Sequence, residues 1–107
     1  MDWEDKLMAI KSLDWSTHLS MRKPGDWYVS WTPEVSTGCM LEGRYGNGTS
    51  PREAVEDHWQ KVTNLMPGEK NIVNATSRDK REAFVWSGFM WERVVEDHLR
   101  GQEKCKP

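Results

Sequence analysis

The sequence has few cysteines and no long hydrophobic run. Cys39 and Cys105 are the two cysteines of the 107 residues, and Cys105 lies in a polar C-terminal stretch. Because we recognise no secretory leader, we expect reduced thiols rather than a disulfide. No apolar stretch approaches the ~18 residues that a membrane-spanning helix needs. These absences predict a cytoplasmic protein without membrane contact.

A block of like charges is also missing. Fifteen basic and seventeen acidic residues are mixed along the chain and leave a formal charge of −2. An extended basic surface for nucleic acid or membranes is therefore not expected. Hydrophobic residues make up only 36% of the chain, but the chain has seven tryptophans. Large aromatic side chains must therefore supply much of the core or of a binding surface.

One helix, at about residues 50–66, is the most clearly marked element. Ser50 is a suitable N-cap, Pro51 falls at the first helical position, and Glu53 stands where a capping box needs it. Apolar residues then recur at helical spacing: Val55, Trp59, Val62 and Leu65 or Met66. Such a stripe predicts that the helix packs on a sheet.

Strands are expected on both sides of this helix, at residues 27–31, 39–45, 70–76, 83–86 and 89–94. The first two should pair antiparallel through a loop at 32–38, and the last two should form a hairpin through Ser87 and Gly88. The predicted fold is α+β: an antiparallel sheet of four or five strands with the central helix on one face, plus a short N-terminal helix.

The ends of the chain follow weaker patterns. Trp3, Leu7 and Ile10 have helical spacing and predict the N-terminal helix. Residues 89–100 fit either a strand to about 94 followed by a short helix, or a helix throughout, and we prefer the first. We expect a single domain over 1–101 and a disordered tail over 102–107.

The tetrapeptide Val-Glu-Asp-His occurs twice, at 55–58 and 95–98. A paired acid–histidine site for a metal or for catalysis is one interpretation. Adjacent helical residues point about 100° apart, however, so the three polar side chains of each copy do not share a face. Residues three and four positions from each histidine offer no zinc ligand, so coincidence and the polar surface of an amphipathic helix explain the repeat better. Since Cys39 also lacks a basic partner in the sequence pattern, we expect no metal, no cofactor and no enzyme.

The glycine-rich segment 46–50 precedes the helix, where backbone N–H groups at Gly48 and Thr49 are candidates for holding an anion or a nucleotide. Neither the phosphate-loop pattern nor the dinucleotide fingerprint is complete, because no lysine follows and residue 51 is proline. A tight turn with positive φ at Gly46 or Gly48 explains the same residues, and we favour it.

Two groups of residues are candidates for binding macromolecules. The cations Arg78, Lys80 and Arg81, with Arg22 and Lys23, could contact nucleic-acid phosphates, although Asp79 and Glu82 dilute the charge of the first cluster. Trp27, Trp31, Trp59 and Trp86 are expected in the core. The candidates for a protein partner are Trp3, Trp15, Trp91 and Tyr28, because tryptophan and tyrosine are common anchors of protein interfaces.

Residues 27–66 carry a Pro33-Glu34 corner, a Gly38-Cys39 pair and a Gly48-to-Ala54 helix start in which Ser50 replaces threonine. In these features the segment resembles the N-terminal domain of HicB-like antitoxins. The resemblance implies a strand, a corner, a second strand and a helix. In that family a DNA-binding segment usually follows. Residues 84–91 are strand-like and uncharged here, so we find no such segment, and the resemblance does not extend to DNA binding.

In size and tryptophan content the whole chain looks like small accessory proteins of bacteriophages, which often inhibit a host factor. The first hypothesis is therefore a non-enzymatic module that binds a host or defence protein. The second is an antitoxin-like or nucleic-acid-binding module, and the third is a small-ligand or nucleotide binder. A homodimer is compatible with each.

Overall fold

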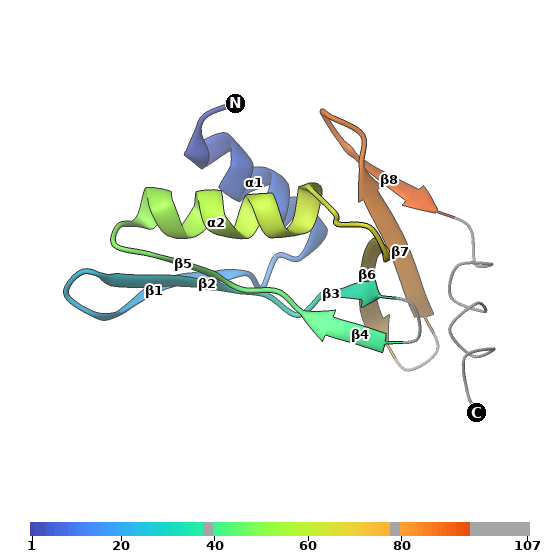
Figure 1. Ribbon diagram of the computed structural model, residues 1–107, viewed down its shortest axis with the longest axis horizontal. Helices are drawn as coiled ribbons and strands as arrows, with labels where there is room; N and C mark the ends of the chain where they lie inside the picture. The colour runs from blue at the N-terminus through green and yellow to red at the C-terminus, as the bar shows by residue number, and fades with distance from the viewer. Residues whose placement is uncertain (38–39, 78–79, 95–107) are drawn as a thin grey trace. The chain divides into compact units, whose positions relative to one another are not determined.

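The computed structural model describes residues 1–37, 40–77 and 80–94 and has the α+β architecture that the sequence predicts. Within these residues, two helices and eight strands form one antiparallel sheet of three strands and one of five (Figure 1). The strands are thus divided between two sheets, where the sequence suggested one. The chain separates into two compact units. Unit 1 comprises residues 1–32 and 44–64, and unit 2 comprises residues 33–43 and the chain from residue 65 onward.

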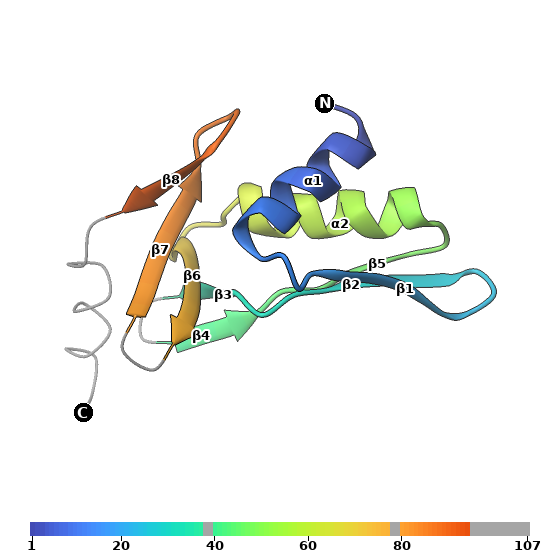
Figure 2. The ribbon, with the colours of Figure 1, turned by 180° about the vertical axis from the view of Figure 1, so that it is seen from behind.

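Unit 1 is a three-stranded sheet with both helices on one face (Figures 1 and 2). Its strands are antiparallel neighbours in the order β1 (His18–Lys23), β2 (Asp26–Ser30) and β5 (Gly46–Gly48). Helix α2 (Pro51–Thr63) packs on all three strands, and helix α1 (Trp3–Leu13) packs on α2. The buried apolar side chains of this unit are Ile10, Val29, Trp31, Ala54, Val55, Trp59 and Val62.

Helix α2 begins as the sequence predicts, with Ser50 as its N-cap. The Ser50 side chain accepts a hydrogen bond from the Glu53 N–H at 3.2 Å. The Glu53 carboxylate accepts from the N–H of Thr49 at 2.8 Å and from the Thr49 hydroxyl. The capping box therefore closes one residue earlier than its standard form, on Thr49 instead of on the cap residue. These bonds, first from the hydroxyl and then from the backbone, lower the pKa of Glu53.

Gly46 and Gly48 are required by the close approach of α2 to β5. A Cβ on Gly46 would lie 2.2 Å from the Ala54 carbonyl oxygen, and one on Gly48 would lie 2.5 Å from the Ala54 nitrogen. The expectation of positive φ at one of these glycines is wrong, since the described residues with positive φ are Gly25, Gly68 and Gly88. Glycine is therefore required at both positions because it has no side chain, and not because the backbone is left-handed.

One side of α2 runs along the outer edge of β5. Glu53, Asp57 and Lys61 follow one another at four-residue spacing on the helix. Asp57 accepts from the Asn47 N–H at 2.9 Å, and Lys61 donates to the Tyr45 carbonyl at 2.9 Å. With the Glu53–Thr49 bonds, the three side chains satisfy backbone groups of alternate residues along this edge. The helix thereby covers a sheet edge that would otherwise be open to another strand.

Helix α1 is capped by Asp2, whose side chain accepts from the Asp5 N–H at 2.9 Å. It is joined to α2 by an ion pair between Lys6 and Glu56, with 2.6 Å between nitrogen and oxygen. Ile10 is its fully buried residue. The predicted N-terminal helix is therefore confirmed, and it is anchored on the second helix.

Unit 2 is a five-stranded antiparallel sheet in the order β4-β3-β6-β7-β8. Its strands are β3 (Glu34–Thr37), β4 (Met40–Gly43), β6 (Glu69–Ser77), β7 (Lys80–Trp86) and β8 (Trp91–Val94). Val35 pairs with Ile72, and Ile72 pairs with Phe84 on its other side. Val35, Ile72, Val73 and Ala83 are buried.

The predicted pairing of residues 27–31 with residues 39–45 is wrong. Strand β2 pairs with β1 and β5, whereas β4 pairs with β3, which lies inside the predicted loop. Pro33 does end the first strand, but the β-branched residues that follow it start a new one. Strand β1 was also missed, because its sequence shows no clean alternation.

The predicted strand at 70–76 and the terminal hairpin are confirmed, but the hairpin loop spans residues 87–90 instead of Ser87 and Gly88 alone. Residues 95–107 lie outside the described part, and so do the predicted end of the domain at 101, the tail and Cys105. Cys39 lies outside it as well. Among the described residues, no helix is long and apolar enough to cross a membrane.

Candidate functional site

The hairpin of β7 and β8 ends in a cluster of large side chains, here called the aromatic tip and defined as residues 86–91. Trp86 and Trp91 face each other across the hairpin as paired residues. Their ring centroids are 5.2 Å apart and the planes are inclined by 68°, an edge-to-face arrangement. Such a pair is favourable beyond its buried area by about 0.5–1.5 kcal/mol. The two rings therefore stiffen the base of the tip.

The turn of the aromatic tip is held by Ser87. Its N–H donates to the Met90 carbonyl at 2.9 Å, its hydroxyl donates to the same oxygen at 3.0 Å, and its oxygen accepts from the Met90 N–H at 3.2 Å. Gly88 has φ 114°, a conformation that strains any residue with a side chain. These hydrogen bonds and the glycine conformation together fix the shape of the loop.

This turn places Phe89 and Met90 in solvent. Phe89 is 80% exposed and Met90 is 49% exposed, although both are large and apolar. No residue from 86 to 91 is titratable. What the aromatic tip offers is therefore apolar and aromatic surface on a pre-ordered support, which is the composition of an interface anchor.

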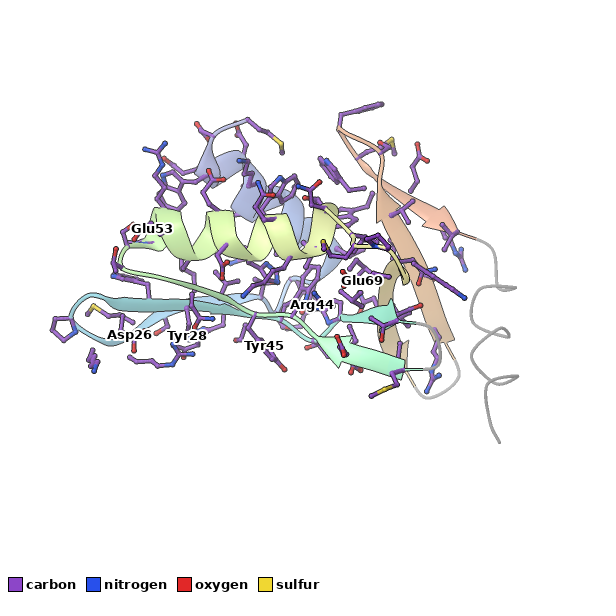
Figure 3. The ribbon with its side chains drawn as sticks, in the orientation of Figure 1. Asp26, Tyr28, Arg44, Tyr45, Glu53 and Glu69 are labelled. Carbon is purple, nitrogen blue, oxygen red and sulfur yellow. The ribbon has the colours of Figure 1, made fainter. Side chains whose placement is uncertain are left out.

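The four residues predicted to bind a protein partner are distributed over both units. Trp91 is half-buried in the aromatic tip of unit 2, whereas Trp3, Trp15 and Tyr28 belong to unit 1. Trp3 opens α1 and is half-buried. Tyr28 lies on β2 and points away from the helices (Figure 3). Trp3 and Tyr28 therefore do not share a surface.

Trp15 is the most exposed of the predicted partner residues, at 86%. It sits in a turn organised by its neighbour Asp14, whose carboxylate accepts from the Ser16 hydroxyl at 2.6 Å and from the Thr32 N–H at 2.9 Å. Burial alone would raise the pKa of Asp14, but the hydrogen bonds from Ser16 and Thr32 outweigh it and lower the pKa. A charged Asp14 thus fixes the turn that presents Trp15.

The tryptophans expected in the core divide into two classes. Trp31 and Trp59 are buried, as predicted. Trp27 and Trp86 are only half-buried. Trp86 is instead part of the aromatic tip, where it supports Trp91.

His58 is the histidine of the first Val-Glu-Asp-His copy and is fully buried at 0% exposure. Its ring meets the Trp31 ring edge-on, with 4.6 Å between centroids. Burial lowers the pKa of His58 to about 4, and the nearby Arg44 backbone opposes this shift only in part. No described residue gives either ring nitrogen a well-formed hydrogen bond. His58 is therefore a neutral core residue and not the surface residue that the sequence suggested.

The second copy of the motif, at 95–98, lies outside the described residues. Within the described ranges, no three histidine, cysteine, aspartate or glutamate side chains gather closely enough to hold a metal ion.

The predicted anion site at Gly48 and Thr49 is occupied by the protein itself. The Thr49 N–H and hydroxyl bind the Glu53 carboxylate, and the Asn47 N–H binds Asp57. Gly48 lies in β5 against α2. Two carboxylates therefore already take the donors that an external anion would need.

Three of the predicted nucleic-acid contacts lie around the β6–β7 connection, and the other two, Arg22 and Lys23, lie on β1. Arg78 is outside the described residues, Lys80 is the first residue of β7, and Arg81 is exposed on β7. Of these three side chains, the structure therefore shows one, that of Arg81, exposed to solvent.

Sequence reasoning missed Phe89 and Met90 as functional candidates. The signal was present, because two large apolar residues follow Ser-Gly between two tryptophans. A two-residue loop, however, would have placed Phe89 inside a strand. No family model, curated protein or solved structure matches the chain, so the functional inference rests on these surfaces.

Proposed function

We propose that this chain is a non-enzymatic protein-binding module that uses the aromatic tip as its anchor. The observation that carries the proposal is the 80% exposure of Phe89 on a turn that Ser87, Gly88 and the tryptophan pair hold in one shape. A rigid aromatic anchor loses little conformational entropy on binding, so more of its burial energy contributes to affinity. Large aromatic side chains are also the commonest hot spots of protein interfaces.

The partner that we propose is a host or defence protein, and the action is inhibition by occupation of its surface. The basis for this choice is the resemblance of the chain to small accessory proteins of bacteriophages. On the same basis we propose that the protein acts in the bacterial cytoplasm. An apolar tip without titratable groups supports binding more than chemistry, because it holds no acid, base or charged nucleophile.

The test is capture of a partner from host lysate by the tagged full-length chain and by two variants. Phe89→Ala removes the exposed ring, and Met66→Ala removes another exposed apolar side chain that is not part of the aromatic tip. Because both side chains are mostly exposed, neither change should alter the free energy of unfolding by more than about 0.5 kcal/mol. Equal melting temperatures confirm that both variants are folded.

The proposal expects a stoichiometric partner that binds the wild type and Met66→Ala and is lost or weakened at least tenfold with Phe89→Ala. A hot-spot aromatic contributes about 2 kcal/mol or more, which is roughly a 30-fold change in affinity. Recovery of no stoichiometric partner, or equal recovery by Phe89→Ala, would contradict the proposal.

A further inference from the structure

The helix-free face of the unit 1 sheet carries a set of planar and polar side chains. Side chains alternate along strands, and Val29 is buried under the helices, so its neighbours Tyr28 and Ser30 point to the other face. The partners in register extend this face across β1 and β5. Figure 3 shows Asp26, Tyr28 and Tyr45 pointing away from the helices. The resulting platform consists of His18, Ser20, Arg22, Asp26, Tyr28, Ser30, Tyr45 and Asn47.

The centre of the platform is an arginine stacked on a tyrosine. The Arg22 guanidinium carbon lies 4.3 Å from the centroid of the Tyr28 ring. One guanidinium nitrogen also donates to Asp26 at 3.3 Å and to the Asn47 side-chain oxygen at 3.2 Å. Three contacts therefore fix the position of the guanidinium, while its side chain stays 48% exposed. The exposed part of the guanidinium can take another flat group against it.

Two further rings flank this stack. The His18 ring centroid is 6.0 Å from that of Tyr28, with the planes inclined by 54°. Tyr45 is 51% exposed and precedes the β5 residues that pair with β2. Ser20 pairs with Tyr28 and Ser30 pairs with His18 across the two strands, so a short polar side chain lies beside each ring. The platform thus offers several flat surfaces at the spacing of neighbouring strands.

The composition of the platform distinguishes between classes of partner. Protein interfaces also use tyrosine and arginine, but the eight residues include no aliphatic, methionine, phenylalanine or tryptophan side chain that would form the apolar core of such an interface. Rings, a guanidinium plane and an amide are instead what unstacked nucleobases bind. Within the platform the charges of Arg22 and Asp26 cancel, and the exposed Lys23 beside it adds one positive charge that complements phosphate.

We propose that this platform binds single-stranded nucleic acid, with bases stacked on the Arg22–Tyr28 pair, on His18 and on Tyr45. The mode is independent of sequence, because every base has a flat face. The proposal does not depend on the aromatic tip, which belongs to unit 2.

The test is fluorescence anisotropy of the full-length chain with labelled oligo(dT) and oligo(rU) of about 12 nucleotides, within the usual site size, at about 50 mM salt. Tyr28→Ala should weaken binding about 5- to 150-fold, the range for loss of one stacked base, and Tyr45→Ala should weaken it in the same range. Tyr28→Phe keeps the ring and should bind like the wild type. Phe89→Ala, the matched aromatic change in unit 2, should have no effect.

Three results would overturn the proposal: no binding to either oligonucleotide, equal binding of a 12-base-pair duplex, or unchanged affinity of both tyrosine variants. Arg22→Gln gives a second measurement that does not depend on the Tyr28 variants folding. It should weaken binding, because glutamine has no guanidinium plane on which a base can stack. Failure here leaves the capture experiment on Phe89 unaffected, so the two proposals are tested separately.

Discussion

At the scale of single residues, burial decides what His58 does. The residue sits at a helical position flanked by Glu56, Asp57 and Lys61, which suggested a solvated surface. The helix nevertheless buries positions 54, 55, 58, 59 and 62, a wider stripe than the predicted one, because it lies flat against β5. A wider stripe is what a helix shows when it packs into the angle between a sheet and a second helix.

Acid should destabilise the protein through His58. Its pKa is about 4 in the folded chain, against about 6.5 when unfolded, so the unfolded chain binds the proton more readily. The contribution of neutral His58 is therefore fully present above about pH 6.5 and is lost as the pH falls towards 4. The difference amounts to about 3 kcal/mol.

Urea unfolding at a series of pH values checks this expectation. His58→Leu, which keeps a similar volume, should flatten the free energy of unfolding between about pH 6.5 and 4. An equally steep decline in the variant would show that other groups control acid stability.

At the scale of elements, local signals predicted some segments and not others. Helix α2 was predictable because cap, proline and apolar stripe agree over a long segment. Strand β5 was not, because residues 46–48 hold two glycines and owe their strand geometry to pairing with β2 and contact with α2. The partners of β2 lie on both sides of it in sequence, and no local pattern specifies them.

The same limit applies to the aromatic tip. Tryptophan content was enough to nominate Trp91. A two-residue turn would pair Trp86 with Phe89, whereas the observed loop pairs Trp86 with Trp91 and releases Phe89 to solvent. A difference of two residues in loop length therefore decides which aromatic side chain is exposed.

The contact between α2 and the β5 edge gives an element-scale prediction. Asp57→Ala removes the acceptor of the Asn47 N–H and the ion-pair partner of Lys61, which lies 2.9 Å away. Because Asp57 is more than a third exposed, solvent screening limits the expected loss to about 1 kcal/mol. Hydrogen exchange at the Asn47 amide should accelerate.

Arg52→Ala, an exposed change on the same helix, serves as the control and should leave that amide unaffected. Unchanged exchange in Asp57→Ala would mean that the bond does not protect the edge.

At the scale of the whole molecule, unit 1 is discontinuous in sequence, since residues 33–43 belong to unit 2. The ends that flank this segment are close, because Val29 of β2 pairs with Gly46 of β5. We therefore expect residues 1–32 joined to 44–64 by a short Gly-Ser linker to fold alone, with modest stability because chains of this length have small cores.

Circular dichroism and thermal melting of this joined chain check the prediction, which expects helical signal and a cooperative transition. The variant of the joined chain with Trp59→Ala should lose the transition, since large-to-small changes at buried aromatics cost about 3–5 kcal/mol. A joined chain that melts without cooperativity would show that unit 1 needs the remainder of the protein.

The three α2 side chains that cover β5 also bear on how the protein behaves at high concentration. Cross-β growth begins when an incoming strand forms hydrogen bonds with unpaired backbone amides and carbonyls. Along the β5 edge, Glu53, Asp57 and Lys61 already form hydrogen bonds with such groups. An incoming strand on this edge would also have to remove water from these three charged side chains, which costs free energy. At high concentration the protein would in this way keep one side of its smaller sheet from seeding fibrils.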